Sequence, residues 1–233
     1  MRGGGTTRGA STPIEASRVV FRSWTWRVSA AESVGFLAPA IAGVLSLGLA
    51  APAGVATVLL AGALEGAVLG LAQASVLRGV LPGLHGGRWT ALTAGAAVAA
   101  YALGFLMSQL GASGSPLGFV GAAAAGLLLL GTIGGAQWLE LRHHVPQAVR
   151  WIGWTAVAWL AALGTFLAIA TPLWHPGQSV INAVAVGVAA GIAMAVVQAA
   201  GTGLGIVRLV SPVTAAEDVG PCPAGSVRPT MKS

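Results

Sequence analysis

The stretch that decides the fold is residues 51–78, which read APAGVATVLLAGALEGAVLGLAQASVLR. Between Pro52 and Arg78 the only charged side chain is Glu65. A predominantly apolar run of about 20 residues is long enough to cross the hydrocarbon core of a bilayer as a helix. Pro52 suits the first helical turn, where the N–H that proline lacks would have no partner inside the helix. This stretch therefore predicts a transmembrane helix that begins near a proline and ends at an arginine.

The same arrangement occurs three times along the chain. A Trp, a Pro and a Gln follow one another as Trp26, Pro52 and Gln73, then as Trp89, Pro116 and Gln137, and then as Trp151, Pro176 and Gln198. The Trp-to-Pro intervals are 26, 27 and 25 residues, and the Pro-to-Gln intervals are 21, 21 and 22. Each set fits two apolar helices joined by a short turn. The sequence therefore predicts an all-α polytopic integral membrane protein, with six transmembrane helices arranged as three tandem two-helix hairpin repeats.

We expect these helices near residues 29–50, 53–77, 89–111, 117–141, 151–171 and 178–208. The membrane domain then spans 29–210, with repeats at about 26–78, 89–142 and 151–208. Residues 1–28 are predicted to form a cytoplasmic tail with an interfacial segment of basic and aromatic residues, and residues 211–233 a flexible cytoplasmic tail. Ser29 and Glu32 match a capping box at the start of the first helix. Pro39 is expected to kink that helix.

Composition agrees with a membrane protein. The chain has 233 residues, of which 55% are hydrophobic and only 8% charged, against about 25% charged residues in a soluble domain. Its net charge is +6, but the Lys and Arg residues lie in the two tails, at helix ends and around the 78–88 and 142–150 loops. This is the positive-inside pattern. It predicts a multi-pass protein of the cell membrane with both termini cytoplasmic, and it excludes nucleic acid as a partner. The expected partners are the lipid bilayer and either another membrane protein or a second copy of the chain.

Small residues precede the glutamine on the second helix of each hairpin. The stripe contains Gly62, Gly66 and Gly70 before Gln73, Gly126 and Gly134 before Gln137, and Gly187 and Gly191 before Gln198. At about 100° per residue, the steps of 7 and 11 residues lie within about 20° of the glutamine. Small residues let helices approach closely, and amides hydrogen-bond between them. The stripe is expected to be a helix-packing seam; the alternative is that the three glutamines form a polar ring around a pathway.

Glu65 is the only acidic residue expected deep in any of the membrane spans. It lies 13 residues before Arg78, which is about 20 Å along a helix. Ionisable side chains at such depth are costly and usually face the bundle interior or water. The other repeats place Leu129 and Ala190 at the corresponding positions. Glu65 is therefore either a structural carboxyl bonded to a neighbouring helix or a group coupled to the movement of protons or cations.

The remaining polar residues do not form a recognisable reactive site in the sequence. Glu140, His143 and His144 form an E-x-x-H-H group, which we interpret as a solvated helix end with a local ion pair. Cys222 is the only cysteine, so it can form neither an internal disulfide nor, alone, a metal site. No nucleophile–base pair or known catalytic motif occurs in the sequence. We therefore expect no enzymatic activity, no cofactor and no metal.

Tryptophans are concentrated near the predicted cytoplasmic face. They are Trp24, Trp26, Trp89, Trp138, Trp151 and Trp154. Tryptophan is enriched at membrane–water interfaces, where its amphipathic ring lies at the level of the lipid headgroups. We therefore expect these residues to anchor the protein in the interface.

One local motif resembles a known pattern. The stretch Gly134-Gly-Ala-Gln-Trp-Leu-Glu-Leu-Arg142 resembles the motif G-x-x-Q-W-x-x-L-R of uncharacterised bacterial multipass membrane proteins. The copy at 70–78 differs by Ala74 in place of Trp, and the third copy keeps Gln198 without the Leu-Arg pair. The resemblance covers roughly residues 26–208 and implies no catalytic residues.

Taken with the composition, this sequence predicts a non-enzymatic integral membrane protein that provides a pathway for a small solute or an ion. The alternative is a structural or scaffold subunit of a membrane complex, and an intramembrane enzyme is a distant third.

Overall fold

The computed structural model describes the backbone of residues 13–46 and 48–218, and in this part of the chain it contains helices and no strands. The helices are α1 (Pro13–Gly35), α2 (Leu37–Ser46), α3 (Ala51–Leu77), α4 (Gly86–Ala112), α5 (Pro116–Leu141), α6 (Arg150–Leu173) and α7 (Val180–Asp218). Taking α1 and α2 as one segment, six segments of the described chain are long and apolar enough to cross a membrane. The predicted class, an all-α protein with six membrane-spanning helices, is confirmed.

The start of the first helix was predicted wrongly. It begins at Pro13 instead of residue 29, so Ser29 and Glu32 lie in the middle of α1 and do not form a capping box. The basic and aromatic segment before residue 29 is helical because one side of it packs on the bundle. Trp24 and Val28, one turn apart, are both fully buried. The other predicted helices agree with α3–α7 to within three residues, except that α7 continues ten residues beyond the predicted end.

The kink expected at Pro39 is a break between α1 and α2. The helix is interrupted at Phe36, one turn before the proline. Proline has no N–H to donate to the carbonyl of Gly35, four residues earlier, and its ring crowds that carbonyl. Backbone bonds on either side persist, from Phe36 N–H to the Glu32 carbonyl at 2.9 Å and from Ala40 N–H to the Phe36 carbonyl at 3.1 Å. The two pieces therefore form one bent membrane segment.

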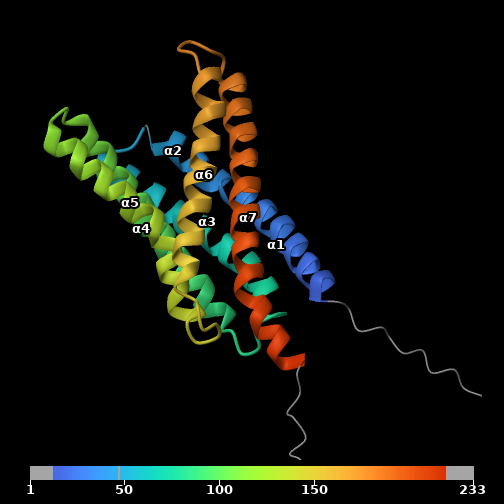
Figure 1. Ribbon diagram of the computed structural model, residues 1–233. Helices are drawn as coiled ribbons and strands as arrows, with labels where there is room; N and C mark the ends of the chain where they lie inside the picture. The colour runs from blue at the N-terminus through green and yellow to red at the C-terminus, as the bar shows by residue number, and fades with distance from the viewer. Residues whose placement is uncertain (1–12, 47, 219–233) are drawn as a thin grey trace, which may run out of the picture.

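The helices form a closed ring. The packed pairs are α1 with α3, α2 with α3, α3 with α4, α4 with α5, α5 with α6, α6 with α7, and α7 with α1. The last pair brings the first and last helices of the chain together, and α1 (blue) and α7 (red) are neighbours in Figure 1. The ring surrounds a partly open central space to which all seven helices contribute lining residues.

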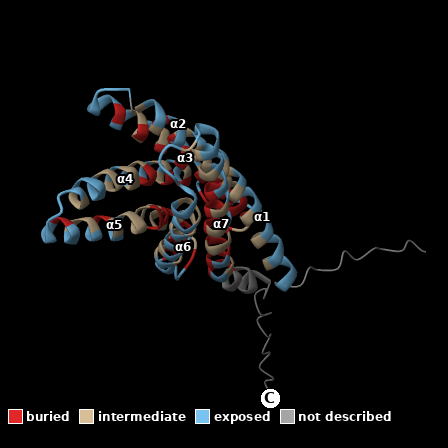
Figure 2. Cartoon of the chain, turned by 90° about the horizontal axis from the view of Figure 1, so that it is seen from above, coloured by how far each residue is buried: buried red, intermediate tan, exposed pale blue. Residues whose placement is uncertain are grey.

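The two ends of the ring differ. We call the end with the 78–85 and 142–149 loops the basic end, because Arg78, Arg88, Arg142 and Arg150 lie there. The opposite end carries the connections 48–50, 113–115 and 174–179. The α4–α5 pair and the α6–α7 pair lie close together at the basic end and diverge toward the opposite end (Figure 1). From above, α4 and α5 extend side by side away from α6 and α7, and α2 lies apart from both pairs (Figure 2).

The hydrophobic core is therefore concentrated at the basic end, where Leu77, Leu81, Leu141 and Val145 belong to one buried cluster. Elsewhere the described helices expose large apolar side chains such as Leu60, Leu127, Val157 and Ile181. A water-soluble monomer rarely exposes so much apolar surface, and lipid is the solvent that suits it. Cys222 and the rest of 219–233 lie outside the described residues, as do residues 1–12.

Candidate functional site

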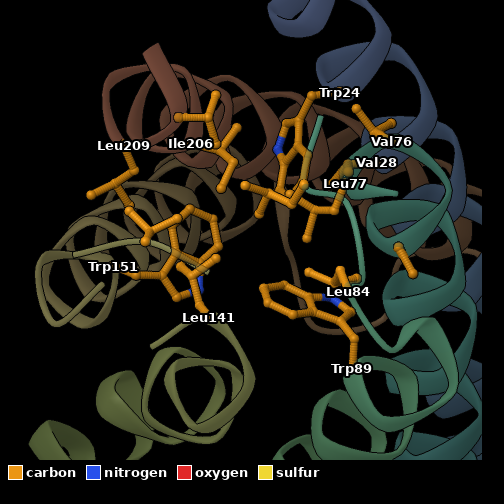
Figure 3. Packing of buried hydrophobic residues seen from close by; sticks show 14 of the residues in the cluster. Trp24, Val28, Val76, Leu77, Leu84, Trp89, Leu141, Trp151, Ile206 and Leu209 are labelled. Atoms are coloured by element: carbon orange, nitrogen blue, oxygen red, sulfur yellow. The ribbon is translucent and has the colours of Figure 1, made fainter. Parts of the chain in front are cut away.

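Three tryptophans meet at the basic end. Trp24, Trp89 and Trp151, from α1, α4 and α6, are fully buried and point toward one another (Figure 3). The ring centroids of Trp24 and Trp151 are 6.0 Å apart in an edge-to-face arrangement, and those of Trp89 and Trp151 are 6.4 Å apart. The prediction that these three anchor the protein in lipid is wrong, because they form the centre of the core instead. Trp26, which is 75% exposed, does face outward.

The glutamines lie beside these rings and bond the helices together. Trp89 Nε1 donates to Gln73 Oε1 at 3.1 Å, and Trp151 Nε1 donates to Gln137 Oε1 at 2.9 Å. Gln137 Nε2 also donates to Gln73 Oε1 at 2.6 Å and to Thr93 Oγ1 at 2.9 Å. Both amides are buried. These contacts match the packing interpretation, in which amides join helices where water is scarce.

The third tryptophan and glutamine, Trp24 and Gln198, are connected differently. Trp24 Nε1 donates to Thr202 Oγ1 at 3.0 Å, and Thr202 Oγ1 donates to the backbone carbonyl of Gln198 at 2.8 Å. The Gln198 amide is fully buried, and neither its oxygen nor its nitrogen has a hydrogen-bond partner among the described residues. The hydrogen bond from Trp24 to Thr202 links α1 to α7 and closes the ring. We call Trp24, Trp89, Trp151, Gln73, Gln137 and Gln198 the Trp–Gln layer.

A cavity of about 650 Å³ lies on the side of the Trp–Gln layer away from the basic end. Leu69, Ile133 and Met194 line it, and each stands four residues, about one helical turn, before one of the three glutamines. Farther from the layer, Gly43, Ser46 and Ser108 extend the lining toward the opposite end. The Trp–Gln layer therefore bounds the cavity on the side nearer the basic end, which we call the inner end of the cavity.

Glu65 lines this cavity and is only 7% exposed. Tyr101 on α4 donates its hydroxyl to Glu65 Oε2 at 2.7 Å. The ring of Tyr101 lies over Gly62, where any added Cβ would collide with it. The expectation that Glu65 faces other helices is confirmed, and the hydrogen bond to a neighbouring helix is the one that the structural interpretation required.

A second buried carboxyl in the same cavity was missed. Glu32 on α1 is 1% exposed, and neither of its carboxylate oxygens has a hydrogen-bond partner in the described part of the chain. Gly35, one turn later on α1, contacts α3 so closely that a Cβ there would lie 3.4 Å from Glu65 Cα. The two carboxyl groups are close enough to interact electrostatically. Glu65 is thus not the only acidic residue deep in the bundle.

The sequence contains a signal for Glu32, which is visible when positions in the first hairpin are counted from Trp24 and not from Trp26. Glu32, Ala97 and Trp159 each stand eight residues after one of the buried tryptophans, and all three line the cavity. Twelve residues after the same tryptophans stand Phe36, Tyr101 and Leu163, which line it too. In the first hairpin this register begins at Trp24, the buried tryptophan. The structure therefore favours Trp24 over Trp26 as the marker of the first hairpin, and the three-hairpin repeat itself stays a prediction.

The glycine stripe packs closely at some positions and not at others. A Cβ would lie 2.6 Å from Ala97 Cβ at Gly66, 2.8 Å from Thr90 Cα at Gly70 and 3.0 Å from Ile152 Cα at Gly134. Contacts are looser elsewhere: 3.2 Å to Phe36 at Gly191, 3.4 Å to Met107 at Gly126, and nothing within 4 Å at Gly187. Within this stripe, the close contacts therefore lie where α3 meets α4 and where α5 meets α6.

Glu140 connects the two loops of the basic end. Its carboxylate accepts the His85 backbone N–H at 3.0 Å and lies 3.2 Å from Arg88 Nη1 and 3.4 Å from His144 Nε2. His143 instead lies 3.5 Å from Arg142 Nε. The local pair expected here, Glu140 with His144, is present, but Glu140 is only 1% exposed, so the prediction of a solvated helix end is wrong at this residue. A second pair, with Arg88, joins Glu140 to the start of α4. Within the described residues, no group of three or more His, Cys, Asp or Glu side chains could hold a metal ion.

Scans against protein-family models, curated proteins and solved structures found no match to this chain. The resemblance of residues 134–142 to the bacterial multipass motif therefore stays a prediction.

Proposed function

We propose that this protein is a non-enzymatic, multi-pass membrane protein whose central cavity binds a small solute on its way across the membrane. The observation that carries the proposal is the cavity of about 650 Å³ with Glu32 and Glu65 in its wall. Its size lies within the range of about 300–1,000 Å³ found for small-molecule sites. A buried ionisable group within a membrane is by default a candidate functional group.

The orientation follows from charge. Positive residues flank the cytoplasmic side of membrane helices, and the arginines around the 78–85 and 142–149 loops lie at the basic end. We therefore propose that the basic end and both termini are cytoplasmic, and that the cavity widens toward the outer face.

The Trp–Gln layer favours a carrier over an open pore. Its three indole rings and the bonded amides of Gln73 and Gln137 fill the inner end of the cavity. A solute could pass only if this layer rearranged, so the protein would need at least two conformations. The described arrangement corresponds to the one that is closed at the basic end.

The Trp–Gln layer also supports the second candidate, a scaffold subunit. Buried, bonded tryptophans and glutamines at the centre of a ring make a rigid framework. In that case the cavity would be filled by lipid or by a partner helix, and the bond from Tyr101 to Glu65 would be structural. The two candidates differ in whether water enters the cavity.

Cysteine reactivity at two adjacent positions separates these candidates. Leu129 lines the cavity, whereas Leu128 is 63% exposed on the outside of the bundle. In a Cys222→Ser background, Leu129→Cys should react with a membrane-impermeant maleimide added from outside, because the thiolate that reacts forms only where water is present. Leu128→Cys, facing lipid, should not react. If neither position reacts in folded protein, the pathway proposal fails and the scaffold function remains.

A further inference from the structure

We propose that the cavity binds a lipophilic organic cation, with Glu32 and Glu65 as its counter-charges. This inference rests on the proposed function, because it names the chemical class of the solute. The argument comes from the charge of the lining, the unpartnered carboxyl and the aromatic walls.

The lining carries charge of one sign only. Its titratable groups are Glu32 from α1, Glu65 from α3 and Tyr101 from α4; the lining residues from α2, α5, α6 and α7 include no titratable side chain. No Lys, Arg or His is among the described residues that line it. An anion would therefore meet two carboxyl groups and no counter-charge. A cation would have both carboxyl groups as counter-charges.

Glu32 lacks the partners that a buried carboxylate requires. A buried charge is costly unless it is paired and hydrogen-bonded. The oxygens of Glu32 are both buried, and within the described chain they have no hydrogen-bond partner, although Glu65 has Tyr101. A ligand with a positive charge would supply the counter-charge that Glu32 lacks.

The walls favour an organic cation over a metal ion. Phe36, Phe105 and Trp159 contribute aromatic rings to a lining that is otherwise mostly Leu, Val, Ile, Met, Ala and Gly. Ring faces attract cations, and the apolar walls would bury a hydrocarbon body. A hard metal ion prefers about six or more oxygen ligands, more than these carboxyl and hydroxyl groups arrange around one point.

Binding should depend on pH. A carboxyl group attracts a cation only when it is ionised, and two neighbouring carboxylates repel each other until a cation lies between them. Binding should therefore displace protons from Glu32 and Glu65, and affinity should fall as the pH is lowered. No other titratable group of the lining changes charge in the acidic range, since the third is the Tyr101 phenol.

Tetraphenylphosphonium and tetraphenylborate provide a matched pair of probes, because they share shape and apolar surface and differ in the sign of the charge. Binding of each to the full chain in nanodiscs of zwitterionic lipid would be measured by equilibrium dialysis, with empty nanodiscs as the baseline. The cation should bind saturably above the baseline, and the anion should not. Glu32→Gln and Glu65→Gln should each weaken cation binding by about tenfold or more, equivalent to 1.4 kcal/mol. Glu15→Gln removes the same charge from an exposed position of α1 and should leave binding unchanged.

A second measurement does not depend on the glutamate variants folding. In Leu129→Cys protein, tetraphenylphosphonium should protect the thiol from the maleimide, and tetraphenylborate should not. Equal binding of both probes, unchanged binding in both folded glutamine variants, or a reactive Leu129→Cys that the cation does not protect would each overturn the cation proposal. In the last case the hydrated pathway still stands. An unreactive Leu129→Cys together with no saturable binding would overturn both proposals.

Discussion

At the scale of single residues, the position of an indole N–H decides whether a tryptophan is an anchor or part of the core. Trp24, Trp89 and Trp151 each donate to a buried acceptor on a neighbouring helix. Trp26 shares α1 with Trp24 but faces outward. The same residue type therefore has two functions within one turn of helix, and the distinction depends on what the other helices place opposite it.

Trp151→Phe should destabilise the protein. Trp151 Nε1 is the hydrogen-bond partner that the structure gives Gln137 Oε1, so its loss leaves a buried oxygen unsatisfied at a cost of about 1–3 kcal/mol. Reversible unfolding in mixed micelles with increasing denaturing detergent would measure the loss. Trp26→Phe is the control, and it should change the free energy of unfolding by less than about 0.5 kcal/mol, as exposed substitutions usually do. Equal stability of the two variants would refute the assigned bond.

At the scale of the helix, the contact between α3 and α4 depends on glycine. Gly62, Gly66 and Gly70 stand at intervals of four residues. Gly66 and Gly70 bring α3 against the backbone and small side chains of α4, and Gly62 leaves room for the ring of Tyr101. In a membrane, helices associate through such close packing because lipid supplies no hydrophobic drive between them. This contact also fixes the distance between Glu65 and Tyr101, and therefore the shape of the cavity wall.

Gly66→Ala should weaken the α3–α4 contact. The added Cβ would lie 2.6 Å from Ala97 Cβ and 2.9 Å from Ala94 Cα, so backbone must move, at a cost of about 1–3 kcal/mol. Gly95→Ala on α4 is a matched control, because nothing lies within 4 Å of its Cβ position. That change should be neutral or stabilise by up to about 1 kcal/mol through helix propensity. Thermal unfolding in detergent would rank the two, and a more stable Gly66→Ala protein would contradict the packing.

At the scale of the whole molecule, charge asymmetry predicts orientation. In a Cys222→Ser background of intact cells, Pro82→Cys and Pro146→Cys at the basic end should resist an impermeant thiol reagent. Ala112→Cys and His175→Cys at the opposite end should react. All four positions are exposed, so access depends on the side of the membrane alone. The reverse labelling would invert the proposed topology, and permeabilised cells, in which all four should react, provide the control.

The sequence by itself determined the class of the fold. The number of membrane-spanning segments, most helix ends and the bend before Pro39 were predictable because hydrophobic length, proline and charge act locally along the chain. The inward direction of Glu65 was also predictable, because an ionisable group in lipid has few other options. None of these conclusions requires knowledge of which helix lies beside which.

Only the tertiary structure decided where α1 begins and where Glu32 lies. The segment before residue 29 is polar enough for a tail, yet it is helical because Trp24 and Val28 pack at the centre of the ring against α7 and α6. The packing of α1 on α3 places Glu32 beside Glu65, although 33 residues separate them in sequence. Packing between helices is a non-local property that no window of sequence contains.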